Sequence, residues 1–187
     1  MEVTLLLRQL HLFERLKDAT RHCHTSGMRH ESVAEHSWRL CLFAYFLTDE
    51  FSDLDMDRVI RMCMIHDLGE CFTGDIPTFE KNAGDEKKES RLLRAWVDTL
   101  PPPYREELTA LYAEMDALIT PEAKLYKALD KLEAVIQHNE SPLATWLPLE
   151  RELNLTYGED AAAFSPYLTA LRQAVRQDTV RKLAQEA

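Results

Sequence analysis

The chain has 187 residues, 45% of them hydrophobic, and a formal net charge of −10 from 22 basic and 32 acidic side chains. This length can bury one large core, so we expect a single domain over residues 1–187. No dense basic cluster occurs, which argues against nucleic acid or an anionic membrane as a partner. No apolar run is long enough for a membrane span, and the N-terminus does not resemble a secretory signal.

The cysteines also bear on the compartment. The sequence has four, without any Cys-x-x-Cys spacing, and at least two lie in apolar helical runs: Cys23, Cys41, Cys63 and Cys71. A secreted domain would pair its cysteines, whereas cytosolic thiols stay reduced. We therefore expect reduced cysteines and a cytoplasmic location.

Apolar residues recur at helical spacing in most of the chain, and no convincing period-2 alternation indicates strands. The first amphipathic helix is predicted from Val3 to Phe13, and a polar loop follows over residues 18–31. Ser32 and Glu35 form a capping box that begins a strongly apolar helix. His36 lies in the first turn of that helix.

A second apolar helix is predicted to begin near Asp55 and to end at His66 and Asp67. Glu70 lies four residues after His66 and three after Asp67. If the helix continues, these three side chains share roughly one face. Gly74 then ends the helix.

Four further helices are predicted in the second half of the chain. The prolines at 101–103 separate the first two. Thr120 and Pro121 provide an N-cap and a first helical residue for a helix that runs to about residue 138. Residues 139–164 look irregular, and a last helix begins at about residue 165. The predicted fold class is all-α, a compact bundle of about seven helices.

Three predicted helices each bring a candidate metal ligand to an apolar setting: His36, the pair His66 and Asp67, and Asp130. Burying such groups unpaired is costly, whereas a metal ion binds neutral imidazole and carboxylate together. The mixed nitrogen and oxygen set suits Mn, Fe, Co, Ni, Zn or, less well, Mg. Each residue alone has a plainer explanation, since His36 can cap its helix and Asp130 can pair with a neighbouring lysine.

The strongest signal is three motifs in a fixed order: ESVAEHSWR, HDLGECFTGDIPT and EAKLYKALDKLEA. Together they resemble the HD-domain metal-dependent phosphohydrolases, and most closely the 5′-deoxynucleotidases. The resemblance covers roughly residues 5–140 and implies the HD-domain helical bundle, with the metal site within residues 20–140. It also implies one divalent metal ion as cofactor, a small phosphate monoester such as a nucleoside 5′-monophosphate as substrate, and a homodimer.

On this resemblance His36, His66, Asp67 and Asp130 correspond to the metal ligands, and Glu70 corresponds to the catalytic glutamate. Hydrolysis of a phosphomonoester requires neutralised charge and an activated water. The metal supplies the first and lowers the pKa of bound water, and Glu70 is placed to hold or deprotonate that water.

The substrate-binding residues are also carried over from the resemblance. Arg21 corresponds to an arginine that orients the phosphate, and its forked guanidinium suits phosphate oxygens. A substrate-contacting segment maps onto Asp75, Ile76, Pro77 and Thr78. The best-known bacterial members carry a tryptophan next to that arginine, where this chain has His22. Selectivity for deoxyribose over ribose is therefore open.

Two alternatives remain at this point. The substrate could be a nucleoside triphosphate or another phosphorylated metabolite, if Lys81, Lys87 and Lys88 reach a longer phosphate chain. The protein could also be a non-catalytic HD-fold module that binds a ligand or partner. A complete ligand set together with Glu70 argues against such a module.

Overall fold

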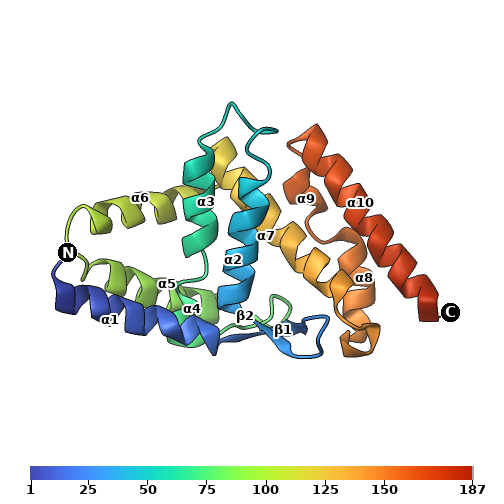
Figure 1. The fold of residues 1–187 in the computed structure, drawn as a ribbon, viewed down its shortest axis with the longest axis horizontal. Coiled ribbons are helices and arrows are strands. Elements are labelled where there is room, and N and C mark those ends of the chain that lie inside the picture. The colour runs from blue at the N-terminus through green and yellow to red at the C-terminus, as the bar shows by residue number, and fades with distance from the viewer. Residues whose placement is uncertain (187) are drawn as a thin grey trace.

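A computed structural model describes residues 1–186 and consists mainly of helices (Figure 1). The helices are α1 (Val3–Phe13), α2 (Val33–Tyr45), α3 (Met56–Ile65), α4 (Glu70–Thr73), α5 (Ala83–Val97), α6 (Tyr104–Ala117), α7 (Pro121–Glu140), α8 (Pro148–Thr156), α9 (Glu159–Ala162) and α10 (Pro166–Leu183). Short 3-10 helices cover Glu14–Lys17, Leu143–Thr145 and Ala184–Glu186. The strands β1 (Thr20–His24) and β2 (His30–Ser32) form one antiparallel pair. The predicted all-α fold class is confirmed.

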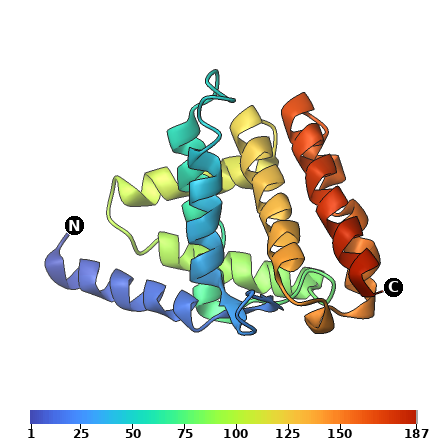
Figure 2. The ribbon, with the colours of Figure 1, turned by 45° about the vertical axis from the view of Figure 1, so that its right-hand side comes forward.

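Helix α7 is the centre of the arrangement. It packs against α2, α3, α6, α9, α10 and strand β1. Figure 2 shows α2, α7 and α10 standing side by side. The core lies where α2, α3 and α7 meet, and its fully buried side chains include Leu40, Met62, Leu129 and Leu132. Burying each such side chain contributes about 1.5–3 kcal/mol to folding.

The predicted helix starts are found at their capping residues. Ser32 Oγ accepts the backbone N–H of Glu35 at 3.3 Å, and the Glu35 carboxylate accepts the N–H of Ser32 at 2.9 Å, which completes the capping box of α2. Thr120 Oγ1 accepts the N–H of Ala123 at 3.2 Å, with Pro121 as the first residue of α7. Local side-chain chemistry therefore determines where these helices begin.

Two segments differ from the sequence interpretation. Residues 18–31, predicted to be a loop, contain β1 and most of β2. Both strands are short and polar, so they show no apolar alternation. Residues 139–164, predicted to be irregular, contain α8 and α9. The start of α8 was missed because its N-cap residue is Leu147, which is not a typical capping residue, although Pro148 follows it.

The helix that carries His66 also ends earlier than predicted. Helix α3 ends at Ile65, His66 is its C-cap, and the chain turns before α4 begins at Glu70. Glu70 is therefore not on one continuous helix with His66 and Asp67. Gly74 ends α4 with φ of 73°, a conformation that glycine adopts without strain.

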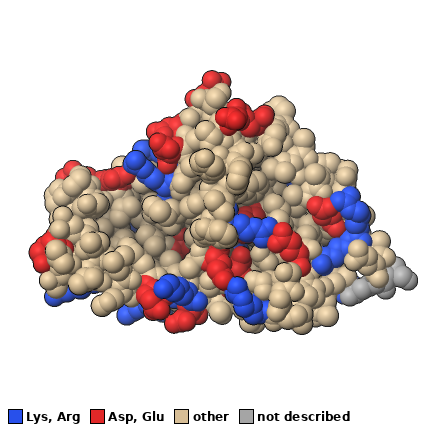
Figure 3. Space-filling model, in the orientation of Figure 1, with Lys and Arg blue, Asp and Glu red and all other residues tan. Residues whose placement is uncertain are grey.

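Among the described residues, no helix combines the length and the apolar character needed to cross a bilayer. All four cysteines are free thiols. On the face drawn in Figure 3, lysine and arginine side chains are interspersed with acidic ones, without a broad basic patch.

Candidate active site

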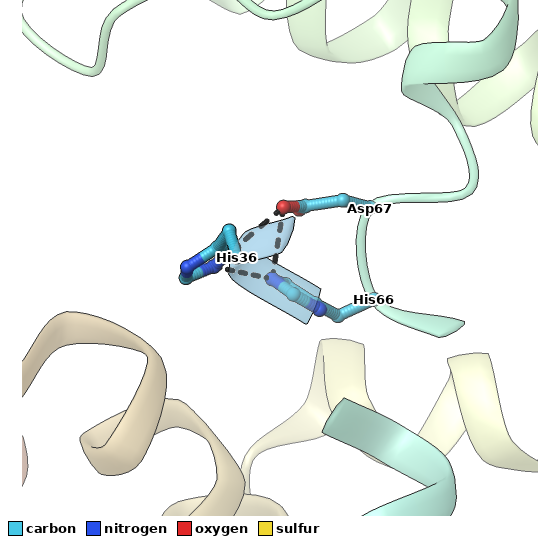
Figure 4. Close-up of side chains that lie close together, drawn as sticks. All are labelled: His36, His66 and Asp67. Carbon is cyan, nitrogen blue, oxygen red and sulfur yellow. Dashed lines mark hydrogen bonds and ion pairs between the residues drawn. The ribbon is translucent and has the colours of Figure 1, made fainter. Parts of the chain in front are cut away.

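Four of the predicted side chains come together where α2, α3 and α7 meet. His36 Nε2 lies 3.2 Å from His66 Nε2, 3.8 Å from Asp67 Oδ2 and 3.3 Å from Asp130 Oδ1. His66 Nε2 lies 2.9 Å from Asp67 Oδ2 and 3.6 Å from Asp130 Oδ1. Figure 4 shows His36, His66 and Asp67 pointing toward one another. Ligands bonded to one ion at about 2 Å lie about 3–3.5 Å apart. The ligand atoms of His36, His66 and Asp67 all lie within 4.8 Å of one another and could hold a metal ion, and Asp130 Oδ1 lies beside both histidines.

The second nitrogen of each histidine fixes its orientation. His36 Nδ1 lies 2.5 Å from Glu133 Oε2, and His66 Nδ1 lies 2.8 Å from the carbonyl oxygen of Cys63. A carbonyl can only accept, and so can an ionised carboxylate. Both Nδ1 atoms therefore carry the proton, and in the neutral rings both Nε2 lone pairs face the common centre. Partners of this kind orient histidine ligands in metalloproteins.

The electrostatics of the centre favour a cation. Burial lowers the pKa of His66, but Asp67 and Asp130 outweigh burial and raise that pKa to about 10. Burial raises the pKa of Asp67, but the two histidines outweigh it, and the pKa falls to about 2. The carboxylates thus stabilise positive charge at this point, and a divalent ion would displace the proton held there.

Asp130 has two partners at once. Its Oδ2 accepts a hydrogen bond from Lys127 Nζ at 2.8 Å, one turn earlier on α7. Its Oδ1 faces the two histidines. The lysine pairing considered from the sequence is therefore present, and it leaves the other oxygen free to bind a metal.

A second group of possible ligands lies behind His36. It consists of Glu31, His36 and Glu133, all buried. Arg21 Nη1 lies 3.2 Å from Glu31 Oε2 and 3.4 Å from Glu133 Oε2, so a guanidinium already supplies positive charge there. This group is better described as a buried hydrogen-bonded network than as a metal site.

That network contains side chains beside the candidate site that were not identified from the sequence. Glu133 joins His36 to Arg21, and Cys23 Sγ donates to the Glu31 carboxylate at 3.3 Å. Burial raises the pKa of Glu133, but the bond from His36 outweighs this and lowers it. Glu133 lies three residues after Asp130, on the same face of α7, and this spacing is the signal that could have identified it.

Glu70 lies at the start of α4 and is buried, with 7% of its surface exposed. Its Oε2 has no hydrogen-bond partner among the described residues. Burial, followed by the nearby Asp67 and Asp75, raises the pKa of Glu70 to about 9. A buried, unpaired carboxyl group with a raised pKa beside candidate ligands is typical of a general acid or base.

These residues open onto a cavity of about 460 Å³, a size typical of small-molecule sites. Asp67, Asp130 and Glu70 line it, and so do all the predicted substrate-binding residues: Arg21, His22, Asp75, Ile76, Pro77 and Thr78. Of the three lysines considered for a longer phosphate chain, Lys81 lines the cavity, but it is paired with Glu89 at 2.7 Å. Lys87 and Lys88 are not among the lining residues.

Several known proteins are similar to this chain. A model of the HD domain matches residues 13–172. The human protein 5′-deoxynucleotidase HDDC2 is 32% identical over 139 residues, which cover 72% of this chain and 67% of that protein. The Xenopus laevis protein of the same name is 31% identical over 163 residues, covering 84% of this chain and 78% of that one.

Solved structures resemble most of the chain. A predicted metal-dependent phosphohydrolase from Magnetospirillum magnetotacticum superposes with a TM-score of 0.76 at 28% identity, covering 95% of this chain and 96% of that one. A conserved hypothetical protein from Pyrococcus furiosus gives a TM-score of 0.72 at 30% identity, covering 91% and 99%.

The bond between Glu133 and His36 yields a first prediction. Glu133→Gln removes the charge that orients His36 and should weaken Mn²⁺ binding by about 10–100-fold. The dissociation constant can be measured by isothermal titration calorimetry. The control is Glu140→Gln on the same helix, an exposed residue paired with Arg39, which should bind Mn²⁺ like the unmodified protein. Equal affinities of all three proteins would contradict an orienting role.

Proposed function

The chain belongs to the HD-domain family, and from this membership we propose that it is a divalent-metal-dependent phosphohydrolase acting on nucleoside 5′-monophosphates. The observation that carries the proposal is the convergence of His36, His66, Asp67 and Asp130 beside a cavity that Asp67, Asp130 and Glu70 line. The substrate class is supported by the relatives named 5′-deoxynucleotidase.

We assign His36 Nε2, His66 Nε2, Asp67 and Asp130 as the ligands of one divalent ion. The arrangement leaves coordination positions for water and a phosphate oxygen. When bound, the ion neutralises phosphate charge and lowers the pKa of a coordinated water. The donor set admits Mn, Co, Fe, Ni, Zn or Mg, and the ligand types alone do not select among them.

Glu70 is the proposed general base. Its unpaired Oε2 takes a proton from the attacking water as the water oxygen forms a bond to phosphorus. The bond from phosphorus to the 5′ oxygen breaks, and that oxygen takes a proton from solvent. A cation in the neighbouring site would lower the pKa of Glu70 from about 9, because opposite charge favours the ionised carboxylate, the form that acts as a base.

Arg21 is the proposed phosphate-binding residue. Its two ion pairs, to Glu31 and Glu133, both use Nη1. Nη2 and Nε then remain available to donate to two phosphate oxygens, the bidentate geometry that a guanidinium favours. We propose that residues 75–78 contact the sugar, with the carboxylate of Asp75 and the hydroxyl of Thr78 near its hydroxyl groups.

A screen for released phosphate tests the function. Nucleotides and sugar phosphates are incubated with the protein and Mn²⁺, Co²⁺ or Mg²⁺ in turn. We expect phosphate from nucleoside 5′-monophosphates with at least one of these ions and none after chelation. Release only from triphosphates, or from none of the substrates, would contradict the proposal.

A pair of variants separates metal binding from catalysis. Asp67→Ala removes a proposed ligand and should abolish both bound metal and phosphate release. Glu70→Gln keeps the shape of the side chain and should lower kcat by about 10²–10⁴-fold while metal binding persists. Metal content by atomic emission and kcat by phosphate release are the two measurements. Equal loss of metal in both variants would make Glu70 a ligand instead.

His22 yields a prediction on sugar selectivity. It lines the cavity, and its ring packs edge-on against Phe79 with centroids 5.6 Å apart. His22 is smaller than tryptophan, and a cavity wall with room for a ribose 2′-hydroxyl rejects that group only weakly. The kcat/KM values for dAMP and AMP should therefore lie within about tenfold of each other. His22→Trp should widen this gap by slowing AMP. If the unmodified protein already prefers dAMP by about a thousandfold, a residue other than His22 excludes the 2′-hydroxyl group.

We also propose that the protein is cytosolic and forms a homodimer. The four free thiols support the location. For the dimer, α1 exposes an apolar stripe at helical spacing, with Val3 70%, Leu6 45%, Leu7 50% and Leu10 52% exposed. In an isologous dimer the same stripe from two copies would cover itself.

Light scattering and sedimentation test the dimer. The unmodified protein should have twice the chain mass, and Leu7→Lys should yield a monomer, because a charge in an apolar contact is unfavourable. Ile119→Lys is the control, since Ile119 is 76% exposed on a different segment and should leave the mass unchanged. A monomeric unmodified protein would refute the dimer.

A further inference from the structure

We propose that the end of the cavity formed by His138, Glu150 and Asn154 reads the nucleobase and favours bases that carry an exocyclic amino group. The inference rests on the proposed function, because it assigns a base to this end and phosphate to the metal end. Glu150 and Asn154 lie on α8, outside the three sequence motifs.

Helix α7 sets the distance between the metal end and the base end of the cavity. Asp130 and His138 both line the cavity, with Ala134 between them on the same face. Eight residues of helix span roughly 12 Å. An extended nucleoside monophosphate covers a similar distance from its phosphate to the far edge of its base. A phosphate near Asp130 therefore brings the base to His138 and α8.

The far end contains buried polar atoms without aligned partners. Glu150 and Asn154 are only 1% and 3% exposed. Glu150 Oε2 accepts the backbone N–H of Leu147 at 2.7 Å, but Glu150 Oε1 and Asn154 Nδ2 form no aligned hydrogen bond within the described chain. Buried polar groups are nearly always satisfied, so both atoms indicate a ligand with complementary polar groups.

The groups around Glu150 Oε1 favour a ligand that donates a hydrogen bond to this oxygen. Its Oε1 lies 3.0 Å from His138 Nε2 and 3.3 Å from His22 Nε2. His138 Nδ1 already donates to the carbonyl oxygen of Ala134 at 3.2 Å. In the neutral ring, His138 Nε2 is then an acceptor, whereas His22 Nε2 can donate to Glu150 Oε1 when it carries the proton. A carboxylate oxygen accepts two hydrogen bonds, so Oε1 can take a further donor beside His22. An amino group, with two N–H donors, suits this position.

The neighbouring amide completes the pattern. Asn154 Nδ2 donates, so it suits a ring nitrogen that accepts, such as N3 beside the amino group of cytosine or N1 beside that of adenine. Uracil and thymine instead present a carbonyl oxygen to the Glu150 carboxylate, lone pair against lone pair. Phe79, Leu153 and Tyr157 also line the cavity and supply apolar surface for the faces of the ring.

The C-terminal helix holds this subsite in place. Arg172 on α10 is 3% exposed, and its Nε donates to the carbonyl oxygen of Tyr157 at 2.8 Å. Its Nη2 donates to the carbonyl oxygen of Asn154 at 3.0 Å. Arg172 thus fixes the end of α8 from which Asn154 faces the cavity, which makes it a positioning residue for the proposed subsite.

The test compares dCMP with dUMP, which differ in the amino or keto group at position 4 and in the ring nitrogen beside it. The measurement is kcat/KM for phosphate release, with 2-deoxyribose 5-phosphate as a substrate without a base. The unmodified protein should prefer dCMP by at least about tenfold. Glu150→Gln should bring the ratio to about one or below, because its amide can donate to the keto oxygen. Glu152→Gln, an exposed neighbour on α8, should keep the original ratio.

The outcomes separate the subsite from the proposed function. Release from all three substrates with equal kcat/KM for dCMP and dUMP would overturn the subsite and leave the function standing. An unchanged ratio in Glu150→Gln would overturn the role of Glu150. No release from any substrate would refute the function itself. The ratio of kcat/KM for dCMP to that for dUMP in the unmodified protein tests the subsite even if the Glu150→Gln variant fails to fold.

Discussion

The arrangement of the site depends on the hydrogen bond between His36 and Glu133. It joins the first turn of α2 to the middle of α7, and both side chains are 1% exposed. The same carboxylate holds Arg21 on β1, so one buried glutamate links a proposed metal ligand to the proposed phosphate-binding residue. Leaving either member of such a buried pair without its partner typically costs about 3–5 kcal/mol. The positions of three chain segments are therefore coupled through one side chain.

The net negative charge of the chain affects how the site can bind an anionic substrate. An acidic protein that binds an anionic substrate requires positive charge at the point of contact. Arg21 and Lys127 both line the cavity and supply part of it, and the carboxylates of Asp67 and Asp130 attract a divalent ion that supplies more. At the far end of the cavity, by contrast, a carboxylate and an amide face a neutral part of the proposed substrate. The cavity thus changes in character along α7, from ionic at Asp130 to polar and aromatic at His138.

Much of the fold could be predicted from sequence, because helix starts are encoded locally. Ser32, Thr120 and Ser165 each precede a helix and cap it, and the apolar spacing of α2, α3 and α7 reports the buried faces directly. The proposed ligands were found through motifs. Glu31 and Glu133 lie within two of these motifs, but their roles were missed because their partners lie on other elements. For Glu133, the spacing of three residues from Asp130 is the one local sign. Helix α8 was not predicted because Leu147 is not a typical capping residue, and the β1–β2 pair was not predicted because both strands are short and polar.

Anomalous X-ray diffraction from crystals soaked in Mn²⁺ tests the central claim most directly. The account predicts one manganese peak, bonded at about 2.0–2.3 Å to His36 Nε2, His66 Nε2, Asp67 and Asp130. A peak between Glu31, His36 Nδ1 and Glu133, or a well-ordered site without manganese at saturating concentration, would contradict it.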